Sequence, residues 1–127
     1  MWKKNPIASE SSVSLQELEK YPCLTFDQGK TNSFYFAEEV FSTYEYKQTI
    51  QVDDRASMLN LMVGLNGYTL CSGIICEELN GSDYAAVPLK ETEVMTIGYV
   101  KRKSIQLSEL AQLYVNELAK YKKLVLK

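Results

Sequence analysis

Three short polar loops carry the residue types in this sequence that could bind a ligand. They occupy positions 27–33, 53–55 and 71–73, and each lies between an apolar, strand-like segment and a helix-like pattern. In an open parallel sheet such loops gather at the carboxyl ends of the strands, where ligands bind. Helix N-termini at that edge present free amides and partial positive charge, which suits a carboxylate. The polar side chains on offer are Gln28, Asn32, Ser33, Ser57 and Ser72.

A structural role competes with ligand binding at these positions. Side-chain oxygens of Asn, Asp and Ser commonly satisfy the free amides at the start of a helix. Taken one residue at a time, Asn32, Asp53 and Ser72 fit this capping role more often than a binding role. Both interpretations stay open at this point.

Catalytic chemistry has little support among the residues of the chain. The absence of histidine removes the commonest general base and the commonest neutral metal ligand. Adjacent acids at 38–39, 53–54 and 77–78 would point about 100° apart on a helix, so they do not form catalytic pairs. Gly64 and Gly67 lack the Gly-Lys-Ser/Thr element of a phosphate loop. We therefore expect no enzyme activity, no metal site and no cofactor.

The cysteines indicate a reducing compartment. Cys23, Cys71 and Cys76 are odd in number, form no C-x-x-C spacing and lie among apolar residues. This usage is typical of reduced thiols in a cytoplasmic protein. We expect all three to be reduced and mostly buried.

The composition fits one globular domain. The chain has 127 residues, 46% hydrophobic and 24% charged, which is enough to hold a core. With a net charge of −2 it lacks the cationic surface that nucleic-acid binding needs. No segment approaches the ~20 apolar residues of a membrane span. We expect a cytoplasmic domain without membrane contact.

Strand and helix patterns alternate along the chain. Strands are expected at 23–26, 47–52, 68–71, 84–89 and 93–100. Helices are expected at 15–19, around 37–44, at 55–66, at 74–79 and at 107–121. Ser14 and Glu17 match a capping box before the first helix, and Gly67 suits a left-handed position after the third. The alternation predicts an α/β layer structure with a largely parallel sheet.

Short motifs follow one another in a specific order over roughly residues 5–120. The first group is Asn5-Pro6-Ile7-Ala8, Val13-Ser14-Leu15-Gln16-Glu17-Leu18 and Tyr21-Pro22. The second group is Val52-Asp53-Asp54-Arg55-Ala56-Ser57-Met58-Leu59-Asn60-Leu61, Gly64-Leu65-Asn66-Gly67-Tyr68-Thr69-Leu70, Val87-Pro88-Leu89, Ile97-Gly98-Tyr99-Val100-Lys101-Arg102-Lys103 and Leu107-Ser108-Glu109-Leu110-Ala111. In order and spacing, they resemble the effector-binding domain of LysR-type transcriptional regulators, mainly its second regulatory subdomain.

The resemblance implies a fold and a function. The fold would be three-layer α/β, with a mostly parallel sheet and helices on both faces, like one lobe of a type II periplasmic binding protein. Residues 5–100 would form the second regulatory subdomain, and 101–127 a final helix that packs on the first subdomain in the family. The function would be effector sensing that modulates DNA binding by the full-length protein. Because this sequence lacks the DNA-binding domain, its linker helix and most of the first subdomain, we expect a fragment.

The resemblance also implies a ligand site and partners. A small-molecule effector, expected to bear a carboxylate, would contact the loop at 28–33 and the turns at 53–55 and 71–73. The residues expected to bind it are Gln28, Gly29, Asn32, Ser33, Asp53, Asp54, Arg55 and Ser72. The last helix lacks its family partner, so we expect self-association with a second copy through Leu110, Tyr114 and Leu118. Contact with DNA would come only through the missing N-terminal domain.

Two other classes of protein compete with this interpretation. One is a lobe of a solute-binding protein or a free-standing ligand-binding module. A solute-binding protein would need an export signal. The other is a small α/β enzyme that uses a cysteine or a carboxylate, against which the lack of histidine counts. Rapid alkylation at neutral pH would distinguish a catalytic thiol from buried ones.

Overall fold

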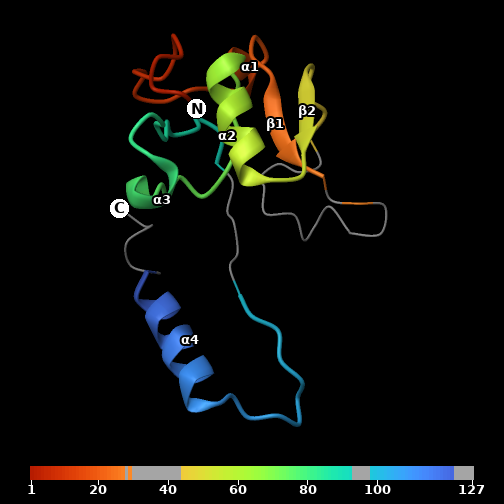
Figure 1. The fold of residues 1–127 in the computed structure, drawn as a ribbon, viewed down its shortest axis with the longest axis vertical. Coiled ribbons are helices and arrows are strands. Elements are labelled where there is room, and N and C mark those ends of the chain that lie inside the picture. Colours follow the sequence, from red (N-terminus) through yellow and green to blue (C-terminus); the bar gives the residue numbers. More distant parts are fainter. Residues whose placement is uncertain (28, 30–43, 93–97, 122–127) are drawn as a thin grey trace. The chain divides into compact units, whose positions relative to one another are not determined.

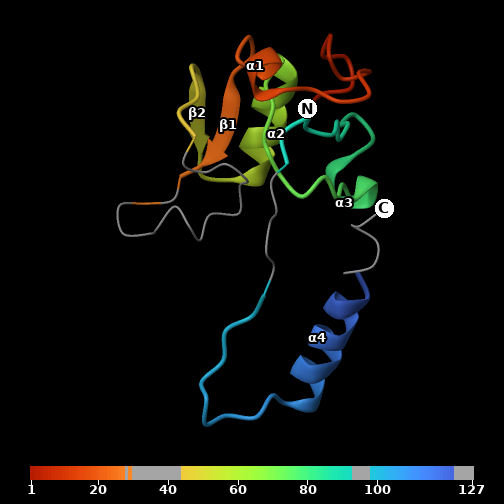
Figure 2. The same cartoon turned by 180° about the vertical axis from the view of Figure 1, so that it is seen from behind.

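The computed structural model describes residues 1–27, 29, 44–92 and 98–121. The elements are α1 (Leu15–Leu18), β1 (Cys23–Phe26), β2 (Thr49–Val52), α2 (Arg55–Gly64), α3 (Glu77–Asn80) and α4 (Glu109–Tyr121). The chain divides into an N-terminal unit, Met1–Met95, and a C-terminal unit, Thr96–Lys127. All elements except α4 belong to the N-terminal unit (Figures 1 and 2).

The N-terminal unit is a small α/β structure around a parallel pair of strands. β1 and β2 pair in register from Cys23 opposite Thr49 to Phe26 opposite Val52. The pairing continues one step further, because the Asp27 amide donates to the Val52 carbonyl at 2.8 Å. Figure 1 shows both strands running in the same direction, with α2 connecting back from the end of β2. The α/β class and the parallel pairing expected from the sequence are therefore confirmed at this coarse level.

The two faces of β1 contact different sets of apolar side chains. Leu24 is fully buried in a cluster that also contains Val52, Met58 and Met62, so α2 packs over this face. Cys23, whose side chain alternates to the other face, lies in a second cluster. Its other buried members are Val13, Leu18, Tyr68 and Leu70. The alternation of β1 thus joins α2 on one side to α1 and the N-terminal segment on the other.

Two of the five expected strands are reduced to single bridges. For the segment 68–71, only Tyr68 pairs with β1, donating to Pro22 and accepting from Leu24. For the segment 84–89, Tyr84 bridges Trp2 and Leu89 bridges Val13. Pro88 has no amide to donate, which limits ladder formation there. The strand predictions for 68–71 and 84–89 are therefore wrong. The first segment still contacts β1, and the second contacts the N-terminal residues Trp2 and Val13.

The remaining predicted elements have mixed outcomes. The expected helix at 74–79 begins only at Glu77, so α3 is a single turn. Of the expected strand at 93–100, only 98–100 are described, and they are not a strand. The expected helix around 37–44 lies outside the described residues, apart from Tyr44.

The end of α2 is closed by a Schellman motif, whose left-handed residue is Asn66 and not Gly67. Asn66 has φ 54°, and the Gly67 amide donates to the Met62 carbonyl at 3.1 Å. Gly67 is needed for a different reason, because a Cβ there would lie 2.2 Å from Leu24 Cδ1 and 3.1 Å from the Pro22 carbonyl oxygen. The close approach of this turn to β1 thus requires a residue without a side chain.

The C-terminal unit contains one described helix, α4. Ser108 precedes it, and its hydroxyl accepts from the Ala111 amide at 3.3 Å, which confirms the predicted helix start. Near the other end, Lys120 pairs with Glu117. Among the described residues, no helix is long and apolar enough to cross a membrane.

Candidate functional site

The loops that follow β1 and β2 leave the sheet side by side. The bond between the Asp27 amide and the Val52 carbonyl places the start of the first loop next to Asp53. Of the eight residues predicted to bind a ligand, Gly29, Asp53, Asp54, Arg55 and Ser72 are described. Gln28, Asn32 and Ser33 lie outside the described residues. The parallel pairing therefore brings together the 53–55 turn and the beginning of the 27–33 loop.

Asp54 is the N-cap of α2. Its backbone is extended, with φ −142°, and its Oδ1 accepts from the Ser57 amide at 2.8 Å. Hydrogen bonds from the Ser57 side chain and amide hold the pKa of Asp54 below its usual value. The capping role considered for this loop is thus filled by Asp54, while Asp53 and Arg55 on either side are exposed.

The cap changes the electrostatics expected at this helix start. A bare helix N-terminus would favour an anion, but Asp54 already occupies the Ser57 amide and adds a negative charge. Asp53 and Asp27, both exposed, add two more carboxylates nearby. Arg55 is the cation of this group. The described edge of the sheet therefore offers one guanidinium for a carboxylate and several carboxylates for an ammonium or other donor.

Gly29 lies in a tight turn just after β1. Its amide donates to Asp27 Oδ1 at 2.9 Å, and its φ of 66° is one that residues with a side chain rarely adopt. The Asp27 carboxylate thus has a local structural partner. Because Gly29 has no side chain, it can contact a ligand only through its backbone atoms, which a ligand could approach closely.

Ser72 lies in a separate exposed loop, after the segment that pairs with β1. Its hydroxyl accepts from the Ile74 amide at 3.4 Å, within its own loop. The Gly73 amide donates to Cys71 Sγ, also at 3.4 Å, and Gly73 has φ 79°. These contacts stabilise the loop itself, and no described hydrogen bond connects Ser72 to the 53–55 turn.

The prediction of mostly buried cysteines is wrong for two of the three. Cys23 is buried in the core, but Cys71 and Cys76 are exposed, and none of the three is in a disulfide. The apolar neighbours of Cys71 misled the prediction, because burial ends at Leu70, two residues after the bridge from Tyr68 to β1.

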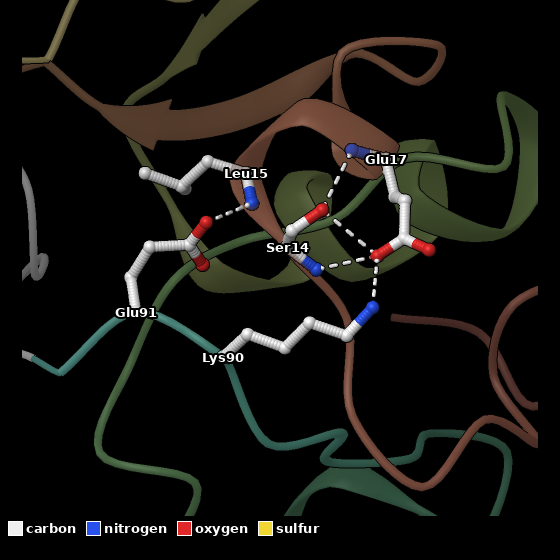
Figure 3. A network of polar contacts seen from close by, with 5 residues as sticks. All are labelled: Ser14, Leu15, Glu17, Lys90 and Glu91. Carbon is white, nitrogen blue, oxygen red and sulfur yellow. Dashed lines mark hydrogen bonds and ion pairs between the residues drawn. The ribbon is translucent and has the colours of Figure 1, made fainter.

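A polar network at the start of α1 was only half visible in the sequence (Figure 3). The capping box is confirmed, with Ser14 and Glu17 bonded in both directions. In addition, Lys90 Nζ donates to Glu17 Oε2 at 2.9 Å, and the Leu15 amide donates to Glu91 Oε1 at 3.0 Å. Nothing in the local pattern around Lys90 and Glu91 indicated contact with a helix more than seventy positions earlier.

This network sets the charge state of Glu17. Hydrogen bonds from Lys90 and then from the Ser14 amide and hydroxyl lower the pKa of Glu17 from 4.5 to about 2. The ion pair with Glu17 in turn raises the pKa of Lys90. Glu91 Oε2 is buried, and no described group donates a hydrogen bond to it. The network fixes the 88–91 segment against α1 and contains none of the predicted ligand-binding residues.

The polar side chains at this edge of the sheet can be described by the roles they have in the structure. The described residues contain no group of three His, Cys, Asp or Glu side chains that could hold a metal ion. The polar groups at the ends of β1 and β2 are caps, turn formers and exposed charges. Comparison of the chain with protein-family models, with curated proteins and with solved structures gives no significant match.

Proposed function

We propose that this chain is an effector-sensing fragment of a LysR-type transcriptional regulator, which binds a small molecule to modulate DNA binding by the full-length protein. In this proposal, residues 5–100 form one three-layer lobe like that of a periplasmic binding protein. The observation that carries it is the junction of two loops at the carboxyl ends of parallel strands, joined by the bond from Asp27 to Val52. The motif from Val52 to Leu61, on which the family resemblance partly rests, spans the last residue of β2, the acidic turn and the first two turns of α2.

The effector class follows from the charges at this junction. A plain dicarboxylate would be repelled by the carboxylates of Asp27, Asp53 and Asp54. Arg55 would be the cation that attracts it. An amino acid or amino-acid derivative instead carries both an ammonium for the carboxylates and a carboxylate for Arg55. We therefore favour the amino-acid class among small carboxylate effectors.

A titration of the isotope-labelled chain by nuclear magnetic resonance tests this function. The probes are L-serine, L-aspartate, succinate and sodium sulfate, added separately. We expect an amino acid to shift the amide signals of Gly29, Asp53, Arg55 and Ser72, with weak affinity because in this proposal a second subdomain provides the rest of the cleft. Shifts that are absent for every probe, or that are scattered over the chain, would contradict the proposal.

The chain offers a matched control for this titration, since Arg55 and Arg102 are its two arginines. Loss of a charge-assisted hydrogen bond costs about 1.5–3 kcal/mol, so Arg55→Ala is expected to weaken binding about tenfold or more. Arg102→Ala removes the same charge in the other unit and is expected to leave the affinity unchanged. Equal effects of the two variants would indicate non-specific charge attraction.

Sequencing the gene upstream of the Met1 codon tests the regulator part of the proposal. We expect an in-frame extension that encodes a helix-turn-helix domain and a further α/β segment. A start at Met1 with its own ribosome-binding site would contradict the fragment interpretation. The outcome of the ligand titration does not depend on this result.

Self-association through α4 is the second part of the proposal. Leu110 is 78% exposed and Tyr114 66% exposed, and Leu118 lies one further helical turn along. Burying this face against a second copy would remove apolar surface from water. In sedimentation analysis we expect a dimer that the pair Leu110→Glu and Tyr114→Glu converts to monomers, whereas Gln112→Glu does not. A wild-type chain that stays monomeric at high concentration would contradict this part.

A further inference from the structure

Two exposed thiols flank a short loop in the N-terminal unit. Cys71 and Cys76 are both exposed and neither is in a disulfide, whereas Cys23 is buried. Four residues separate the two, so a bond between them would close a small ring. Apart from Ile75, which is half-buried, the residues from 71 to 76 are exposed. Reagents therefore reach these two sulfurs and not the third.

The loop between these thiols bends at Gly73 and is held by weak local contacts. Gly73 has φ 79°, and its amide donates to Cys71 Sγ at 3.4 Å, so this sulfur lies over its own loop. Cys76 precedes the single turn of α3, and its thiol donates to Glu78 Oε2 at 3.2 Å. A disulfide requires Cα atoms about 4.4–6.8 Å apart, so the exposed loop must fold more tightly about Gly73 for the bond to form. Forming it would replace the Cys76–Glu78 bond and leave β1, β2 and α2 intact.

We propose that Cys71 and Cys76 form a reversible intramolecular disulfide when the chain meets a peroxide. One thiolate attacks the peroxide, so that an S–O bond forms, the O–O bond breaks and one water leaves after proton uptake. The second thiolate attacks the resulting sulfenic sulfur, so that the S–S bond forms, the S–O bond breaks and a second water leaves. Two thiols lose two electrons and two protons, and one hydrogen peroxide becomes two waters. A dithiol reductant reverses the change by thiol–disulfide exchange.

The bridge would restrain Ser72, which lies inside the closed ring. This consequence rests on the proposed function, in which Ser72 is an effector contact. Disulfide formation itself is measured without any effector. A bridge that forms without changing amino-acid binding would therefore count against the role of Ser72 and leave the redox site intact.

Peptide mapping of the full chain tests the bridge directly. Trypsin cleaves after Arg55 and Lys90 with no cleavage site between them, so a single peptide, 56–90, contains Cys71 and Cys76 without Cys23. The chain is treated with hydrogen peroxide, alkylated in denaturant and digested. We expect the 56–90 peptide to be unalkylated and lighter by two hydrogen atoms, while the Cys23 peptide carries an alkyl group. Dithiothreitol before alkylation should restore two alkyl groups on 56–90.

Thiol counting gives a second measurement. The native chain should expose two rapidly reacting thiols before peroxide and none afterwards, with Cys23 reacting only in denaturant. Cys76→Ser should abolish the bridge, whereas Cys23→Ala should retain it. If Cys23→Ala does not fold, the peptide map of the peroxide-treated wild-type chain alone shows whether Cys71 and Cys76 are bridged. Chains linked to one another through Cys71 or Cys76, or sulfinic acids on both sulfurs without a bridge, would overturn the proposal.

Discussion

The two units of this chain use the same kind of helix pattern in different ways. In the N-terminal unit, α2 buries Met58 and Met62 to 4% and 2% exposure against β1 and β2. In the C-terminal unit, α4 leaves Leu110 and Leu113 at 78% and 60% exposure. Among the described residues, every buried apolar side chain belongs to the N-terminal unit. A helical stripe therefore predicts a helix in both places, but burial follows only where another element covers the stripe.

This contrast separates the sources of stability in the two units. α2 is stabilised by long-range packing, which is the larger contribution for most protein helices. In the described part of the chain, α4 relies on local contacts, such as the Ser108 hydroxyl at its start and the bond from Gln112 to Asn116. Matched substitutions in the two units, or at neighbouring positions within one unit, measure this difference.

The largest effect is expected from a Leu→Ala pair that compares the two units. Leu24→Ala removes a fully buried side chain between β1 and α2, and should lower the free energy of unfolding by about 2–5 kcal/mol. Leu113→Ala, at 60% exposure on α4, should change it by no more than about 0.5 kcal/mol. Urea denaturation followed by circular dichroism measures both. Equal destabilisation by the two substitutions would mean that α4 is also buried in solution. Self-association through α4 would give this result.

A glycine pair tests how closely the turn after α2 packs on β1. Gly67→Ala would place a methyl group against Leu24 and the Pro22 carbonyl, and should destabilise the chain by about 1–3 kcal/mol. Gly64→Ala has open space around its Cβ and removes glycine from the end of a helix, so it should be neutral or stabilising by up to about 1 kcal/mol. Thermal unfolding midpoints that fall by the same amount in both variants would contradict the packing argument.

Neighbouring aspartates provide a smaller and more local comparison. Asp54→Ala removes the N-cap of α2 and should cost about 0.5–2 kcal/mol. Asp53→Ala removes an exposed carboxylate one position earlier and should have an effect within about 0.5 kcal/mol. Urea midpoints measured side by side distinguish the two. A larger loss of stability for Asp53→Ala than for Asp54→Ala would mean that Asp53, and not Asp54, caps α2.

Much of the N-terminal unit could be predicted because its signals are local. The capping box at Ser14 and Glu17, the apolar run of β1 and the Asp cap before α2 each lie within a few residues. The parallel pairing followed from the alternation of helix and strand patterns. The junction of the loops after β1 and β2 followed in turn from that pairing.

The failures concern features set by distant parts of the chain. Strand pairing with β1 stops after the single bridge at Tyr68, and burial ends two residues later at Leu70, so Cys71 is exposed. The contact of Lys90 with Glu17 depends on where the 88–91 segment lies against Val13, which no short pattern encodes. Of the candidate site, the 53–55 turn lies beside the start of the 27–33 loop, whereas Ser72 lies in a loop of its own.

The smallest expected effect concerns the pH dependence of this long-range contact. The pKa of Glu17 is about 2 in the folded chain and 4.5 in the unfolded reference, so the unfolded chain takes up the proton first as the pH falls. The stabilisation from Glu17 is therefore complete above about pH 4.5 and is lost between that pH and about pH 2. Glu17→Gln should flatten the loss of stability in this window, measured as unfolding midpoints from pH 6 to pH 2.

A second variant divides this effect between the two halves of the network. Lys90→Met removes the long-range donor but leaves the Ser14 amide and hydroxyl on the Glu17 carboxylate, at 2.8 Å each. Its pH profile should therefore lie between those of the wild type and Glu17→Gln. If the Lys90→Met profile coincides with that of the wild type, the capping box alone holds the Glu17 carboxylate ionised. The ion pair would then position the 88–91 segment without contributing to acid stability.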